Sequence, residues 1–98
     1  MERPTVRRMA RADISWVRAD ENGDKLVVYA EQVRARWDFF CRARRHDDWE
    51  VLENPTLEDW REVLDGVRRR TQRRQYAPGE AEKLEAILRK QFPGVDFD

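Results

Sequence analysis

The Asn22-Gly23 pair constrains the fold more than any other feature of this sequence. It separates two runs rich in β-branched and aromatic residues, Ile14 to Ala19 and Lys25 to Ala30. Asn-Gly between such runs is the strongest short signal for a hairpin, because a type I′ turn needs positive φ at both central residues. We therefore predict an antiparallel hairpin over residues 14–30 with a two-residue loop.

A two-residue loop also predicts the register of this hairpin. Trp16 would lie opposite Tyr29 on one face, and Asp20 would lie opposite Lys25 as a favourable cross-strand ion pair. Both faces of the hairpin then carry apolar side chains. We interpret Trp16 and Tyr29 as candidate interface aromatics that could meet a partner protein or a second copy of the chain.

Residues 31–45 allow two interpretations. Trp37, Phe39 and Cys41 alternate with charged side chains, which is the spacing of a strand, and aromatic residues favour strands. This pattern predicts a second hairpin over residues 36–53. The alternative is a helix over residues 31–45, which would make the domain mostly α.

Two helices are predicted after the second hairpin. Asn54 can cap the first helix, Pro55 suits its first turn, and Thr56 and Asp59 have the spacing of a capping box. We expect this helix to cover about residues 56–74. Its expected apolar stripe is formed by Leu57, Trp60, Leu64, Val67 and Thr71.

Pro78-Gly79 ends the first helix, and a second helix is expected over about residues 79–91. The short connection predicts that the two helices lie antiparallel. The expected apolar face of the second helix consists of Ala81, Leu84, Ile87, Leu88 and Phe92. Pro93-Gly94 ends this helix, and Phe97 beyond it is either an anchor or loose.

These patterns predict an α+β fold in which a small antiparallel sheet is followed by two antiparallel helices packed on one face. The 98 residues are enough for one domain with one core. We expect a flexible basic arm over residues 1–12, a single globular domain over residues 13–92, and a short C-terminal tail over residues 93–98.

The chain carries no motif of a known catalytic or cofactor-binding class. Its one cysteine and one histidine, Cys41 and His46, make a structural zinc site improbable. We therefore expect no enzyme activity, no metal and no cofactor, and no small-molecule ligand is evident. The first residues lack the apolar segment of a signal peptide, and no apolar run reaches the roughly 18 residues of a membrane span, so a cytoplasmic protein is expected.

Arginines are grouped along the chain although the formal net charge is zero. Residues 34–46 and 66–74 carry five arginines each, and the intervening residues 47–65 carry eight acidic residues. Basic and acidic blocks could pair internally as the elements pack. Alternatively, arginines could form a patch that contacts phosphate. The candidate phosphate contacts are Arg42, Arg44, Arg69, Arg70 and Arg73.

The sequence therefore predicts a small non-catalytic protein-interaction domain whose partner is another protein or a second copy of the chain. Tryptophan and arginine are enriched at interface hot spots, and four tryptophans are many for one small core. Binding to the nucleic-acid backbone through the arginines is the alternative prediction.

Overall fold

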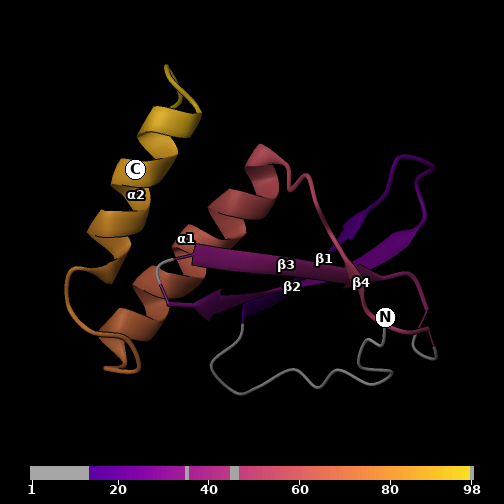
Figure 1. Ribbon diagram of the computed structural model, residues 1–98, viewed down its shortest axis with the longest axis horizontal. Coiled ribbons are helices and arrows are strands. Elements are labelled where there is room, and N and C mark those ends of the chain that lie inside the picture. Colours follow the sequence, from indigo (N-terminus) through magenta and orange to yellow (C-terminus); the bar gives the residue numbers. More distant parts are fainter. Residues whose placement is uncertain (1–13, 35, 45–46, 98) are drawn as a thin grey trace. The chain divides into compact units, whose positions relative to one another are not determined.

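The structure is a computed structural model that describes residues 14–34, 36–44 and 47–97. The chain divides into two compact units, and the boundary lies between Asn54 and Pro55. The first contains a four-stranded antiparallel sheet and the second contains two helices (Figure 1), which confirms the predicted α+β class. The single domain over residues 13–92 and the packing of the helices on one face of the sheet stay predictions. The basic arm predicted over residues 1–12 lies outside the described residues.

The sheet is a meander in which each strand pairs with the next one along the chain. The strands are β1 (Ile14–Ala19), β2 (Lys25–Val33), β3 (Arg36–Arg42) and β4 (Glu50–Val51), in that spatial order. The second unit contains α1 (Leu57–Gln72) and α2 (Glu80–Gln91). The mostly α alternative, with residues 31–45 helical, is therefore wrong.

The loop of the first hairpin is one residue longer than predicted. The Asp20 backbone N–H donates to the Asp24 carbonyl at 2.8 Å, which leaves three residues in the loop, and Gly23 has φ of 85°. The Asp20 carboxylate accepts the N–H groups of Asn22 and Asp24 at 2.8 and 2.9 Å. These two bonds stabilise the wider loop, since aspartate competes well for nearby backbone donors. The predicted pair of Asp20 with Lys25 is therefore wrong.

The longer loop shifts the register of the hairpin by one residue. Trp16 lies opposite Val28, and Tyr29 lies opposite Ser15. A shift of one residue reverses the faces, because side chains alternate along a strand. Trp16 and Tyr29 are consequently on opposite faces of the sheet, and the prediction that they share a face is wrong.

The second hairpin is confirmed as strand structure. Trp37, Phe39 and Cys41 share one face of β3, as the alternating pattern predicts, and Phe40 is buried on the other face. β2 continues to Val33, three residues beyond the predicted hairpin, and turns into β3 through Arg34, whose φ is 59°.

Aromatic rings pack on both faces of this sheet. Tyr29 stacks on Phe40 with ring centroids 5.0 Å apart, and Trp49 contacts Tyr29 edge-on at 4.7 Å. On the other face, Trp16 contacts Phe39 edge-on at 6.1 Å. Edge-on and stacked rings stabilise a core beyond the area that they bury. The first unit is therefore a sheet with aromatic packing on each side.

The predicted capping box begins α1. The Asp59 backbone N–H donates to Thr56 Oγ1 at 3.1 Å, and the Thr56 N–H donates to Asp59 Oδ2 at 2.9 Å. Thr56 is the N-cap, so the suggestion that Asn54 caps the helix is wrong. The reciprocal bonds satisfy two backbone donors that a helix start otherwise leaves open.

The two helices run antiparallel and lie side by side (Figure 1), as the short connection predicts. The buried residues on their apolar faces are Val63, Leu64 and Val67 of α1 and Ala81, Leu84 and Leu88 of α2. Ile87 is 50% exposed, so its predicted place on the apolar face is wrong. α2 begins directly after Gly79, which has φ of 95°.

Candidate functional site

One face of the sheet exposes apolar side chains at both of its edges. Val17 lies opposite Val27, which lies opposite Arg42, and Val51 lies opposite Phe40 on the same side. Val17 is 57% exposed and Val51 is 61% exposed. We call the surface formed by Val17, Val27, Arg42, Trp49 and Val51 the valine face.

Trp49 and Arg42 form the centre of the valine face. The Arg42 guanidinium carbon lies 4.3 Å from the centroid of the Trp49 ring, a cation–π contact. Among residues 14–34, 36–44 and 47–97, no hydrogen-bond partner lies against the buried Nε of Arg42. The Trp49 ring therefore holds this guanidinium against the sheet.

The structure separates the two predicted interface aromatics. Tyr29 is fully buried below Trp49 and beside Phe40, so its ring offers no surface to a partner. Trp16 is half-buried on the opposite face of the sheet. The expected register, wrong by one residue, did not place Val17 beside Val27. Val51 was not singled out by any pattern in the sequence.

The five candidate phosphate contacts do not come from one element. Arg42 and Arg44 belong to the first unit, and Arg69, Arg70 and Arg73 belong to the second. Arg69 forms an ion pair with Asp65, and Arg70 Nη1 donates to the Gly66 carbonyl at 3.4 Å. Arg44 and Arg73 are exposed. The phosphate-binding role of these arginines stays a prediction.

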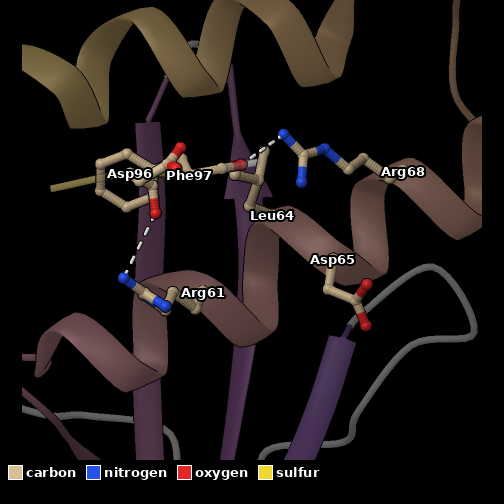
Figure 2. A pocket seen from close by; sticks show the side chains of 6 residues that line it. All are labelled: Arg61, Leu64, Asp65, Arg68, Asp96 and Phe97. Carbon is tan, nitrogen blue, oxygen red and sulfur yellow. Dashed lines mark hydrogen bonds between the residues drawn. The ribbon is translucent and has the colours of Figure 1, made fainter.

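A second candidate site lies within the helical unit. It is a hollow of about 170 Å³, and Figure 2 shows the side chains around it. The lining residues are Arg61, Leu64, Asp65, Arg68, Asp96 and Phe97. They come from α1 and from the segment that follows α2, so this site joins residues that are distant in the sequence.

Two arginines of α1 hold the segment that follows α2. Arg61 Nη2 donates to the Asp96 carbonyl at 3.3 Å, and Arg68 Nη2 donates to the Phe97 carbonyl at 2.7 Å (Figure 2). The Phe97 side chain is only 3% exposed. Phe97 is thus an anchor, which sequence analysis had left open.

Arg68 also reaches α2. Its Nη2 donates to Glu85 Oε1 at 2.8 Å, and Arg89 Nη2 donates to Glu85 Oε2 at 2.6 Å. Hydrogen bonds from Arg89 and then from Arg68 lower the pKa of the Glu85 carboxyl below its ordinary value. Glu85 therefore holds the Arg68 guanidinium, which also donates to the Phe97 carbonyl.

Residues 14–34, 36–44 and 47–97 contain no group of three or more His, Cys, Asp or Glu side chains that could hold a metal ion. His46 lies outside these residues. None of the helices in the same ranges is long and apolar enough to cross a membrane.

No protein-family model matches the chain, and no match was found to a curated protein or to a solved structure.

Proposed function

We propose that this chain is a non-catalytic cytoplasmic domain that binds another protein, or a second copy of itself, through the valine face. The observation that carries the proposal is the exposure of Val17 and Val51 at the two edges of one apolar sheet face. Covering each of these side chains would contribute roughly 1 to 1.5 kcal/mol to an interface. The single cysteine of the chain fits a reducing compartment.

The centre of the valine face has the composition of an interface hot spot. Tryptophan and arginine dominate such hot spots, and here the Arg42 guanidinium lies 4.3 Å from the Trp49 ring centroid. Trp49 in turn rests edge-on against Tyr29. Because these side chains already contact one another, binding would cost little further side-chain entropy.

The test compares two neighbouring exposed residues of β4 whose side chains lie on opposite faces. Val51→Gln changes the valine face, whereas Glu50→Gln is the matched control on the other face. Sedimentation equilibrium measures self-association of the full chain, and affinity capture compares the proteins retained by each variant. We expect Val51→Gln, alone or with Val17→Gln, to weaken self-association or to lose a partner that Glu50→Gln retains.

The proposal fails if the full chain stays monomeric at high concentration and no retained protein depends on Val17 or Val51. Equal losses in Val51→Gln and Glu50→Gln would also contradict it, since only one of these side chains belongs to the valine face.

Binding to the nucleic-acid backbone stays the alternative, because the side chains of Arg44 and Arg73 are exposed. A salt titration of RNA and DNA binding tests it. Backbone contacts predict a steep salt dependence that Arg44→Glu and Arg73→Glu reduce. Absence of binding at ~50 mM salt would remove this alternative.

A further inference from the structure

The segment 95–97 lies against α1 without regular secondary structure of its own. It follows a turn at Gly94, whose φ is 84°, and the Val95 N–H donates to the Phe92 carbonyl at 3.3 Å. Beyond this turn, the side chains of Arg61 and Arg68 donate hydrogen bonds to its backbone. The segment is thus held by side chains of α1 that donate to its backbone carbonyls.

The hydrogen bonds from Arg61 and Arg68 to the backbone do not depend on the side chains of segment 95–97. Arg61 and Arg68 are seven residues apart on α1, which places them two turns and roughly 10 Å apart on the same side of the helix. They donate to consecutive carbonyls, those of Asp96 and Phe97. Every peptide has backbone carbonyls. These two bonds therefore orient a bound peptide, and its sequence must be selected by other contacts.

Selectivity comes from the aromatic anchor. The Phe97 ring lies 6.4 Å from the Phe92 ring and 5.8 Å from the Arg61 guanidinium, measured from ring centroids. Burial of a phenyl ring is worth several times a single hydrogen bond to a carbonyl. A peptide without an aromatic residue at this position would therefore bind far more weakly.

The charges around the groove favour an acidic peptide. The guanidinium groups of Arg61 and Arg68 line it. Arg68 also pairs with Glu85 of α2, a carboxylate that it shares with Arg89. Asp65, which also lines the hollow, is paired with Arg69. An acidic residue next to the aromatic anchor, as Asp96 is next to Phe97, thus complements the groove.

We propose that the groove on α1 lined by Arg61, Leu64 and Arg68 is a binding site for an acidic peptide segment of another protein, anchored by a phenylalanine, and that residues 95–97 occupy it as a built-in competitor. This site is separate from the valine face and does not rest on the function proposed for it. The hollow of about 170 Å³ lies between α1 and the two residues Asp96 and Phe97, so space remains beside the competitor.

In the native chain, segment 95–97 competes with an added peptide at a high effective concentration. It is joined to α2 by a short connection, and short connections give effective concentrations in the millimolar range. An added peptide must therefore exceed this range to displace Phe97. Removing the anchor of the competitor should make the groove accessible at much lower peptide concentration.

The test uses the full chain and a labelled peptide, acetyl-Gly-Val-Asp-Phe-amide, which copies residues 94–97. Fluorescence anisotropy measures its Kd for the native chain and for Phe97→Ala. We expect Phe97→Ala to bind at least ~10-fold more tightly than the native chain, because truncation of a buried phenyl ring strongly weakens the competitor. The same peptide with alanine in place of phenylalanine should not bind.

A pair of arginine variants, each combined with Phe97→Ala, tests the grip on the backbone. Arg68→Lys keeps the charge but loses the planar fork, and it should weaken peptide binding roughly fivefold. Arg73→Gln, at the C-cap of the same helix but outside the groove, is the matched control and should leave the affinity unchanged. Equal effects of the two variants would contradict the proposed grip.

A folded Phe97→Ala chain that binds the peptide no better than the native chain overturns the proposal. If circular dichroism shows that Phe97→Ala does not fold, the native chain labelled with 4-fluorophenylalanine replaces it. The ¹⁹F resonance of Phe97 is assigned by its loss in Phe97→Leu. Its chemical shift should then move toward that of a solvent-exposed ring as the peptide concentration rises into the millimolar range. An unchanged resonance at ~10 mM peptide would equally overturn the proposal.

Discussion

Replacing Arg74 by glycine should stabilise the helical unit relative to the same change one residue earlier. At the end of α1, the Gln75 N–H donates to the Arg70 carbonyl at 2.8 Å, and the Arg74 N–H donates to the Thr71 carbonyl at 3.0 Å. This pair of bonds is a Schellman motif, in which the residue after the C-cap adopts a left-handed conformation. Arg74 has φ of 63°, in a position that glycine usually occupies.

The magnitude follows from the difference between two positions. A non-glycine residue in the left-handed region costs roughly 1 to 2 kcal/mol, which glycine avoids. Arg73 has φ of −90° and ψ of 6°, so glycine relieves nothing there. Both substitutions remove one positive charge from the same helix end and add the same flexibility to the unfolded chain. Arg74→Gly should thus be more stable than Arg73→Gly by about 1 to 2 kcal/mol.

Urea unfolding followed by circular dichroism at the helix band measures this difference. In a thermal melt, each kcal/mol corresponds to roughly 4 to 8 °C for a domain of this size. Arg74→Ala is a further control, because it removes the charge but keeps the left-handed strain, and it should be less stable than Arg74→Gly. If Arg74→Gly is no more stable than Arg73→Gly, the strain assigned to Arg74 is absent.

Three further predictions concern the cap, the first hairpin and the ion pairs of the helical unit. Thr56→Ala should cost about 1 kcal/mol of unfolding free energy in urea titrations, since the Asp59 N–H loses its acceptor, and an unchanged midpoint would contradict the capping box. Gly23→Ala should cost roughly 1 kcal/mol or more because Gly23 has φ of 85°, whereas Gly23→Asn should cost less; equal melting temperatures of the two variants would argue against the left-handed conformation of Gly23. The pKa of Glu85 is lowered by Arg89 and Arg68, so its contribution is present above its ordinary pKa of 4.5 and is lost as the pH falls through the lower value of the folded state. The free energy of unfolding, measured as the pH is lowered below 4.5, should accordingly fall less steeply in Glu85→Gln than in the native chain. Identical pH dependence of the two chains would refute the stabilising role of the Glu85 ion pairs.

Local signals in the sequence predicted the elements whose cause is also local. The capping box depends on two side chains three residues apart, Thr56 and Asp59, and the structure forms both of its bonds. Alternation of Trp37, Phe39 and Cys41 likewise identified β3. In each case, the residues that produce the structure are the residues that carry the pattern.

The first turn shows why register was harder to predict. Asn-Gly is compatible with a two-residue and with a three-residue loop, and the Asp20 carboxylate favours the longer one through two backbone N–H groups. The turn at Arg34 carries no glycine or asparagine although its φ is 59°. Pairing of the flanking strands determines that turn, and pairing is not visible in a window of a few residues.

Prediction of the candidate sites from the sequence depended on the same register and on contacts between distant residues. The valine face follows from the observed register, so an error of one residue concealed it and placed Tyr29 at a surface instead of in the core. The groove that holds Phe97 combines α1 with residues that lie about thirty positions later in the sequence. No spacing rule connects such positions, and only the folded chain brings them together.

The meander order of the sheet has a kinetic consequence. Each ladder joins strands that are consecutive in the chain, and the most distant partners of the first hairpin are Ile14 and Ala30. Closing such short loops costs little chain entropy. Each hairpin can therefore form from its own turn, independently of segments that are distant in the sequence. We expect the sheet to form within milliseconds, so that the inner strands β2 and β3 stay unpaired only briefly during folding.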